Sequence, residues 1–139
     1  MGIGIQHKKG TTMVSKYREL LEKVRDLKIN KDDMPPLRYE DETDLLEDPV
    51  IIERKHLINV LKRFKQEVIH QGELFDWVHF VWFSDLFTCA DEDADCIAGV
   101  IQVLEELEEE GDIMPEEVEH CLYALENNVE AQRLFDHSL

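Results

Sequence analysis

Residues 73–87, ELFDWVHFVWFSDLF, form a strongly apolar stretch around which the rest of the fold is expected to organise. Ten of its fifteen residues are apolar, and it holds both tryptophans and four of the six phenylalanines. A helix that is hydrophobic nearly all round has to be covered by other elements of the chain. The stretch therefore predicts a central buried helix.

The segments before this helix show two further helical patterns and one break. Residues 13–28 repeat apolar side chains at helical spacing and predict a first, basic amphipathic helix. Residues 29–48 contain Pro35, Pro36 and many acids, and predict a linker or partly extended crossing segment. Asp48 and Pro49 favour the start of a long helix that runs to about Gln71 and stops at Gly72.

The segments after the central helix predict two more helices. Apolar residues from Ile97 to Leu107 mark a fourth helix that ends at Gly111, and Pro115 opens a fifth. Asn127 and Asn128 are expected to interrupt it before a short last helix through Val129 and Leu134. No stretch alternates with period two, so the sequence predicts an all-α bundle of five or six helices. Its core should include Leu61, Phe64, Trp77, Val78, Leu104, Leu107 and Leu122.

The length of 139 residues with 43% hydrophobic content suits one domain, expected over residues 13–139 with an acidic helical body at 49–139. Residues 1–12 are expected to be disordered or derived from a cloning vector. No segment approaches the roughly 18 apolar residues of a membrane span, and no secretory signal is recognisable. The three cysteines are odd in number and include no CxxC pair, which suits a reducing compartment better than disulfides or a zinc site; they are Cys89, Cys96 and Cys121. We therefore expect a soluble, cytoplasmic protein.

Acidic residues dominate the charge, with 32 Asp and Glu against 15 Lys and Arg and a net charge of −17. Residues 1–31 carry +5, so the remainder carries −22, and residues 66–132 contain nineteen acids and no Lys or Arg. Exposed helices normally mix both signs, because opposite charges at i,i+4 stabilise them. The one-signed run favours a strongly basic partner, with solubility alone as the alternative. It disfavours direct nucleic-acid binding, which needs cations to neutralise phosphates.

The stretch ADEDADC at 90–96 places Asp91, Asp93 and Asp95 at every second position, as in an EF-hand calcium loop. Such a loop needs Gly at its sixth position and a bidentate Glu at its twelfth, where this chain has Cys96 and Gln102. A helix N-terminus also favours aspartate. We therefore expect one of these acids to cap the fourth helix and the others to face solvent or a partner.

Four of the six histidines follow an acid by three residues, as in carboxylate-histidine metal bundles. His70 and His120 fall on the polar sides of their helices, which favours surface pairs over metal ligands. Cys89 could approach His79, but neither it nor Ser84 has the context of a catalytic nucleophile. We expect no catalytic residues, metal or cofactor. The four pairs are Glu53/His56, Glu67/His70, Asp76/His79 and Glu117/His120.

Two stretches of the sequence resemble a known family: LINVLKRFKQEVIHQGELFDWV at 57–78 and IQVLEELEEEGDIMPEEVEHCLYAL at 101–125. The order of a long helix, a glycine, a Trp-containing helix, an acidic cap and a short helix is similar to the small helical immunity proteins of the colicin D and contact-dependent growth inhibition type. The resemblance implies a protein that binds a basic nuclease toxin and blocks its active site with acids that imitate phosphates.

The charge pattern and the resemblance together predict a partner-binding surface made of acids, with one aromatic anchor. The alternatives are an acidic DNA mimic or anti-defence inhibitor, a helical adaptor and, less favoured, a metal-binding bundle. Trp82 is the expected anchor, because a helix apolar nearly all round cannot bury every side in a small protein. The acids are Asp85, Asp91, Glu92, Asp93, Asp95, Glu105, Glu106, Glu108, Glu109, Glu110, Asp112 and Glu116.

Overall fold

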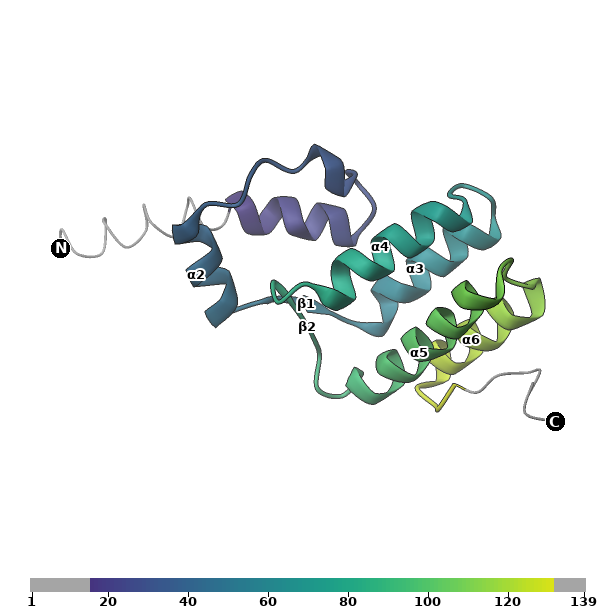
Figure 1. Ribbon diagram of the computed structural model, residues 1–139. Coiled ribbons are helices and arrows are strands. Elements are labelled where there is room, and N and C mark those ends of the chain that lie inside the picture. Colours follow the sequence, from purple (N-terminus) through teal and green to yellow (C-terminus); the bar gives the residue numbers. More distant parts are fainter. Residues whose placement is uncertain (1–15, 132–139) are drawn as a thin grey trace, which may run out of the picture.

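The computed structural model describes residues 16–131 and confirms the predicted all-helical class. These residues form six α-helices, one short 3-10 helix and two short parallel strands (Figure 1). In chain order they are a helix over 16–25, η1 (Lys31–Asp33), α2 (Tyr39–Glu47), β1 (Val50–Ile52), α3 (Arg54–Lys65), α4 (Gln71–Phe83), β2 (Phe87–Cys89), α5 (Ala94–Glu110) and α6 (Pro115–Asn127).

The helical hairpin of α3 and α4 lies at the centre, with α5 and α6 on one side and helix 16–25 and α2 toward the other end (Figure 1). Buried side chains from Leu21 to Leu125 form one continuous core. Of the seven predicted core residues, six are buried, and Phe64 is half-buried against the same core. The apolar stretch at 73–87 thus supplies α4, as predicted, although the helix ends at Phe83 and Phe87 belongs to β2.

The predicted helix start at Asp48 and Pro49 is wrong. Asp48 ends α2, and the next three residues form β1, which pairs in parallel with β2 so that Val50 faces Phe87. The run Val-Ile-Ile explains the difference, because β-branched side chains lose rotamer freedom in a helix and fit an extended strand. The hairpin of α3 and α4 serves as the crossover that a parallel pair requires.

The predicted stop at Gly72 is also wrong. Helix α3 ends earlier, where Glu67 adopts a left-handed conformation (φ 62°) and the N–H of Val68 donates to the carbonyl of Arg63 at 2.9 Å. This backbone arrangement satisfies the last carbonyls of the helix in the way that a C-terminal glycine usually permits. Gly72 instead lies in the first turn of α4.

The predicted linker at 29–48 contains a helix. Residues 34–38 have no regular secondary structure, as expected for a linker, but α2 follows and buries Asp41 and Leu45. The predicted end of the fourth helix at Gly111 and the opening of the fifth at Pro115 are confirmed. Asn128 ends α6 in a left-handed conformation, and 129–131 are not helical. The rest of the expected last helix, residues 13–15 of the first helix and the N-terminus at 1–12 lie outside the described residues.

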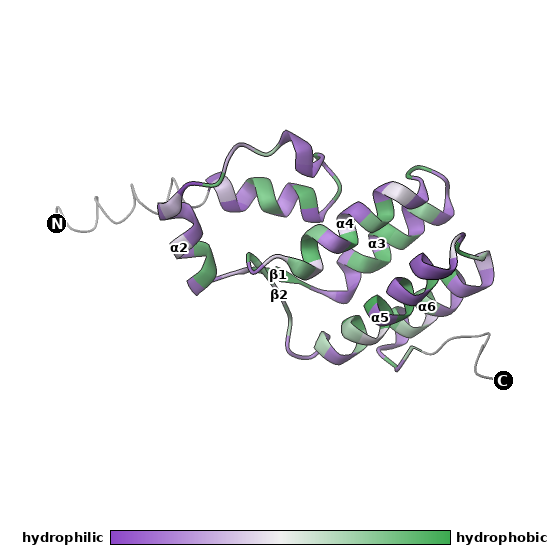
Figure 2. Cartoon of the chain, in the orientation of Figure 1, coloured by the Kyte–Doolittle hydropathy of each residue, from purple (hydrophilic) through white to green (hydrophobic). Residues whose placement is uncertain are grey.

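Hydropathy follows this arrangement, with hydrophobic residues on the inner sides of the helices and hydrophilic residues on the outer sides (Figure 2). Along α5 the colour of the outer side changes from pale near the start to hydrophilic purple near the end. None of the helices within residues 16–131 has both the length and the apolar character that crossing a membrane requires.

An acidic helix face beside an apolar cleft

Helix α5 is amphipathic and carries six of the twelve predicted acids. Its inner side buries Cys96, Ile97, Val100, Ile101, Val103, Leu104 and Leu107. The outer side, together with the loop before it, presents Asp91, Glu92, Asp95, Ala98, Gly99, Gln102, Glu106 and Glu109, which we call the α5 face. The 3.6-residue period produces this division, because residues three and four apart lie on one side of a helix.

Asp93 is turned inward and is not part of this face, contrary to prediction, because only 5% of its surface is exposed. Its Oδ1 accepts a hydrogen bond from Nε of Arg54 at 2.7 Å, and its Oδ2 accepts from the backbone N–H of Arg54 at 3.1 Å. Burial alone would raise the pKa of the Asp93 carboxyl, but the hydrogen bonds and charge of Arg54 outweigh it and lower the pKa below its usual value.

Asp93 directly precedes α5, as the sequence predicts for a capping aspartate, but its side chain caps a different helix. Arg54 is the first residue of α3, so its backbone N–H is one of the donors that a helix leaves unpaired at its start. The carboxylate of Asp93 therefore joins the beginning of α3 to the beginning of α5.

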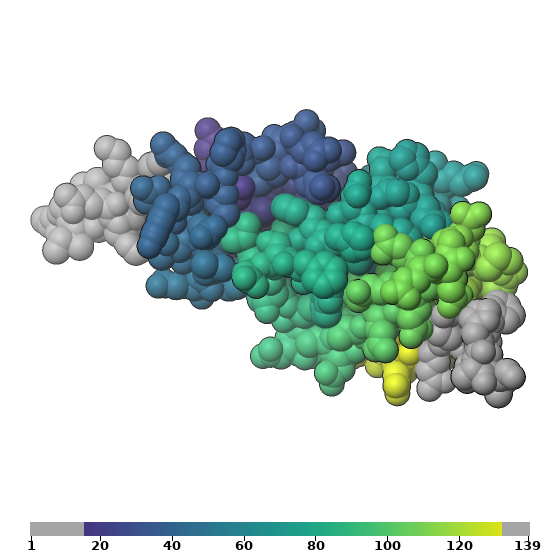
Figure 3. All heavy atoms as spheres, in the orientation of Figure 1, coloured from purple at the N-terminus to yellow at the C-terminus, as the bar shows by residue number. Residues whose placement is uncertain are grey.

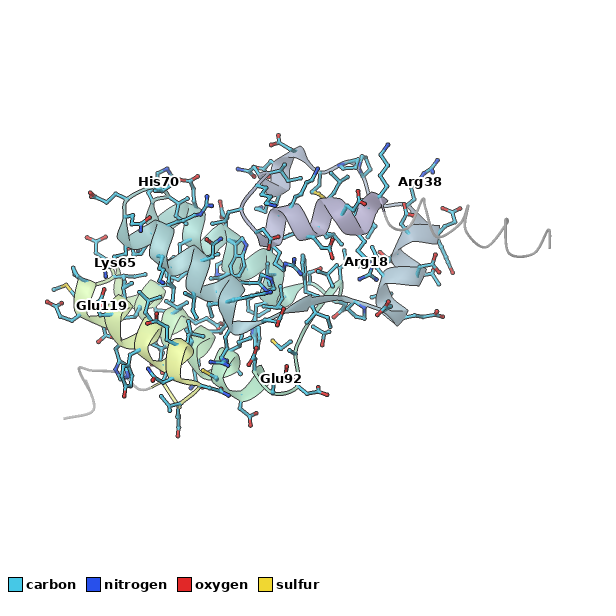
Figure 4. All side chains as sticks on the ribbon, turned by 180° about the vertical axis from the view of Figure 1, so that it is seen from behind. Arg18, Arg38, Lys65, His70, Glu92 and Glu119 are labelled. Atoms are coloured by element: carbon cyan, nitrogen blue, oxygen red, sulfur yellow. The ribbon has the colours of Figure 1, made fainter. Side chains whose placement is uncertain are left out.

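The loop that carries Asp91 and Glu92 is attached at two further points. The N–H of Ala90 donates to the carbonyl of Ile52 at 2.9 Å, and the side chain of Asn128 donates to the carbonyl of Glu92 at 3.4 Å. Glu92 projects outward at the start of α5, away from Arg18 and Arg38 near helix 16–25 and α2 (Figure 4). Because the loop is held from several sides, its exposed acids are positioned before any partner arrives.

An apolar cleft of about 470 Å³ lies between α4, β2 and α5, beside this loop. The teal side chains of α4 and the green side chains of α5 adjoin on one face of the molecule (Figure 3). The cleft brings together three residues of the predicted surface: Trp82, half-buried, and the exposed Asp91 and Asp95. Among the described residues, its lining contains no Lys, Arg or His; the rest are Ile52, Leu57, Trp77, Val78, Val81, Phe87, Thr88, Cys89, Ala94, Ile97, Ala98 and Ile101.

A wider groove of about 840 Å³ lies on the other side of the same helix turn. It shares Asp95 and Ala98 with the apolar cleft, so Asp95 stands on the ridge between the two hollows. Three further carboxylates line this groove, those of Glu92, Glu106 and Glu130. The beginning of α5 is therefore bordered by an apolar hollow on one side and an acidic one on the other.

A second group of predicted acids lies toward the opposite end of α5, roughly 15–22 Å along the helix from Asp95 at 1.5 Å per residue. They are Glu105, Glu106, Glu108, Glu109, Glu110 and, in the following loop, Asp112. Oε1 of Glu108 lies 2.9 Å from Nε2 of His79. Asp85, after α4, and Glu116, at the start of α6, are exposed elsewhere. The predicted acids thus concentrate toward the two ends of α5, and Glu106 connects them because it also lines the wider groove with Glu92 and Asp95.

Cys89 borders the apolar cleft, but its environment favours the protonated thiol, which is a poor nucleophile. Burial, and secondarily the charge of Asp93, raises the pKa of Cys89, which disfavours the nucleophilic thiolate. His79, its suggested neighbour, lies between the rings of Phe75 and Phe83 and contacts Glu108. The cleft is therefore suited to binding apolar groups rather than to nucleophilic chemistry.

Of the four predicted acid-histidine pairs, Glu53/His56 forms a contact, whereas His70 and His79 contact other acids. His56 accepts a hydrogen bond from the backbone N–H of Glu53 at 2.8 Å, and His70 lies 3.0 Å from Glu73. Asp76 and His79 are both exposed, whereas Glu117 is buried and His120 is half-buried. Within residues 16–131, no three His, Cys, Asp or Glu side chains are grouped as a metal site would require.

Sequence reasoning missed the residues that position the site. Arg54 lies 39 positions before Asp93, and no local pattern signals this contact. Two further residues follow α6 in the chain: Glu130 lines the groove beside the beginning of α5, and Asn128 donates a hydrogen bond to the loop before it.

Comparison of the chain with protein families, with curated proteins and with solved structures finds no match.

Proposed function

We propose that this protein is an inhibitor that binds a strongly basic protein, a nuclease toxin, through the α5 face. The observation that carries the proposal is the placement of exposed Asp91 and Glu92 on an anchored loop, and of Asp95 in the first turn of α5, beside an apolar cleft without Lys or Arg in its described lining. Binding surfaces typically combine an apolar centre with a polar rim. Here the charged residues of the rim, Asp91 and Asp95, are both acidic.

The acids of α5 have a cost in the unbound protein that a basic partner would remove. The last turn of the helix contains no basic residue, although the partial negative charge at a helix C-terminus favours cations. Neighbouring acids at i,i+3 and i,i+4 also repel each other. Lys and Arg of a partner would relieve both effects on binding, so the arrangement favours association over stability of the free chain.

A nuclease is the class of basic protein that this surface fits best. An enzyme that cleaves nucleic acid holds phosphates with Lys and Arg, and closely spaced carboxylates compete for the same cations. Asp91 and Glu92 are adjacent in the sequence and Asp95 follows about one helical turn later, so three carboxylates lie close together. The resemblance to small helical immunity proteins points to the same class of partner.

A DNA mimic is the second candidate, favoured by the spread of exposed acids along about 25 Å of α5. A mimic of a regular duplex would need carboxylates at continued intervals, whereas Ala98, Gly99 and Gln102 leave an uncharged gap in the middle of the face. The apolar cleft also has no counterpart in a phosphate backbone. These two features favour a partner with a compact basic cleft.

The proposal is tested by co-expression with a toxin, because an immunity protein is expected to be encoded directly downstream of a large toxin with a basic C-terminal domain. Wild-type protein should protect cells that express this domain. Simultaneous Asp91→Lys, Glu92→Lys and Asp95→Lys substitution should abolish protection. The matched control reverses three exposed acids on α2, Glu42, Asp44 and Glu47, and should still protect. Protection by the α5 variant, or none by wild type, would overturn the proposal.

A further inference from the structure

The cleft between α4, β2 and α5 is more than an edge of the acidic surface. We propose that it binds one large apolar side chain of the basic partner, next to a Lys or Arg of the same partner that pairs with Asp91 or Asp95. This inference rests on the proposed function and specifies the chemistry of the partner: an apolar residue adjacent to a cation, on a protruding loop or helix.

The volume and lining of the cleft fit an apolar side chain. At about 470 Å³ it lies within the range of roughly 300–1,000 Å³ typical of ligand pockets. The inner wall is formed by core residues such as Val81, Ile97 and Ile101, and the outer wall includes Trp82. An apolar side chain inserted here would lose its water on the sides that face these walls, and such buried anchors supply much of the binding energy of an interface.

The charges at the mouth select the occupant. Asp91 and Asp95 are exposed there, and the cleft is lined by no cation within the described residues. An anionic occupant such as a fatty-acid carboxylate would be repelled, and a wholly apolar one would gain no attraction from the two carboxylates. An apolar group that carries a positive charge satisfies both parts of the site. That combination also matches the charge of the partner inferred from the α5 face.

The cleft is formed before binding. Asp93, which lies between the two rim acids, is fixed by Arg54, and Ala90 is hydrogen-bonded to the end of β1. A preformed pocket loses little conformational entropy when it is filled. The apolar insertion should therefore slow dissociation, whereas the exposed rim acids should mainly speed association.

The cleft can be tested without any partner by titrating the full chain with n-hexylammonium chloride and following amide and indole NMR shifts. We expect shifts at Thr88, Cys89, Ile101 and the Trp82 indole. The anion n-hexanoate, which has an alkyl chain of nearly the same length, should bind at least about fivefold more weakly, because the rim acids repel it. Absence of shifts at the cleft, or equal binding of hexanoate, would overturn the inference.

Two blocking variants then test the role of the cleft in the complex. Ala94→Phe fills the cleft from α5, and Thr88→Trp covers its mouth from an exposed position on β2. With the basic toxin domain, each should raise the dissociation rate at least about tenfold and change the association rate less than about threefold. The control is Thr43→Phe, at an exposed position on α2 outside both the cleft and the α5 face, which should dissociate like wild type. If Ala94→Phe and Thr88→Trp both dissociate like wild type, the inference is wrong.

The two proposals fail in different ways. If wild type binds the toxin domain and the α5 charge variant does not, but the blocking variants behave normally, the proposed function stands and the role of the cleft is refuted. If hexylammonium binds the cleft but wild type binds no basic toxin domain, the proposed function is refuted, and this role of the cleft with it.

Discussion

Arg54 and Asp93 are joined by two hydrogen bonds, one from the guanidinium Nε at 2.7 Å and one from the backbone N–H at 3.1 Å. The same guanidinium donates through Nη1 to the carbonyl of Leu125 near the end of α6, at 2.7 Å. One arginine at the start of α3 therefore connects α5 and α6. The exposed acids Asp91 and Asp95 lie two residues to either side of the connected aspartate, so this contact positions the candidate binding loop.

Replacing Asp93 should destabilise the protein, because Arg54 would lose a charged acceptor in a buried position. We expect Asp93→Asn to lower the free energy of unfolding by about 1–3 kcal/mol in urea titrations. The lowered pKa of Asp93 means that its contribution is present above the unfolded pKa of about 3.9 and is lost as pH falls through the lower folded value. The difference between wild type and variant should therefore shrink below about pH 4.

The matched control for this substitution is Asp91→Asn, two residues away and exposed. It removes the same charge without removing a buried contact, and should change the free energy of unfolding by less than about 0.5 kcal/mol. Equal effects of the two substitutions would show that Asp93 has no special structural role.

Protonation of His56 should contribute to unfolding in acid. Burial, and next the charge of Arg25, lowers the pKa of His56 to about 4 from 6.5. Its Nδ1 accepts from the N–H of Glu53, so the neutral ring is the form that fits. Because the unfolded chain binds a proton more readily, this contribution to stability is complete above about pH 6.5 and is lost as pH falls to about 4. The loss amounts to roughly 3–4 kcal/mol, at about 1.4 kcal/mol per pKa unit.

His56→Gln keeps an acceptor for the Glu53 N–H and removes the titrating group. The free energy of unfolding of this variant, measured by urea titration, should therefore depend less steeply on pH than that of wild type between pH 6.5 and 4. His70→Gln, which removes an exposed imidazole, is the control for the loss of a histidine. Parallel curves for wild type and His56→Gln would contradict this assignment.

Charge reversal at the end of α5 should stabilise the free protein. Glu109 is exposed in the last turn, beside other acids and at the negative end of the helix dipole. We expect Glu109→Lys to raise the free energy of unfolding by about 0.3–1 kcal/mol at low salt, and by less at 0.5 M salt, where surface charges are screened. A destabilised Glu109→Lys variant would show that the acids of α5 are not mutually repulsive in the free state.

The two glycines at helix ends should respond in opposite directions to substitution by alanine. Gly111 has φ 113° with nothing near its missing Cβ, so Gly111→Ala adds backbone strain without a clash and should cost about 1–3 kcal/mol. Gly72 lies in the first turn of α4, and its Cβ would meet Nδ1 of His70 at an ordinary 3.9 Å. Gly72→Ala should stabilise by about 0.4–1 kcal/mol. Thermal unfolding of both variants measures the contrast.

Elements with strong local signals could be predicted from the sequence. Pro115 and Gly111 mark the boundary between α5 and α6, because the first lacks an N–H that helix starts leave unpaired and the second tolerates a positive φ. The strand Val50–Ile52 could not be predicted, since three residues are too few to show an alternating pattern. Its conformation depends on pairing with β2, more than 30 residues away.

The candidate site was predictable in its charge but not in its geometry. The absence of Lys and Arg from residues 66–132 indicates an acidic surface, and Asp91 and Asp95 are exposed beside Trp82 at the cleft. Asp93 belongs to the same acidic stretch but is buried by Arg54, a contact that follows from the packing of α3 against α5. Local sequence patterns do not encode such distant contacts.

Stopped-flow measurement of the association rate with the basic toxin domain, from 50 to 500 mM salt, shows whether the acids of the α5 face attract the partner. An acidic surface that attracts a basic cleft should give a wild-type rate that falls at least about tenfold over this range, with a much smaller change in the dissociation rate. The Asp91→Lys, Glu92→Lys, Asp95→Lys variant should associate far more slowly at 50 mM salt, and the α2 control variant should keep the steep salt dependence. A wild-type association rate that does not change with salt, or an α5 variant that associates as fast as wild type, would show that the α5 face does not attract the basic partner.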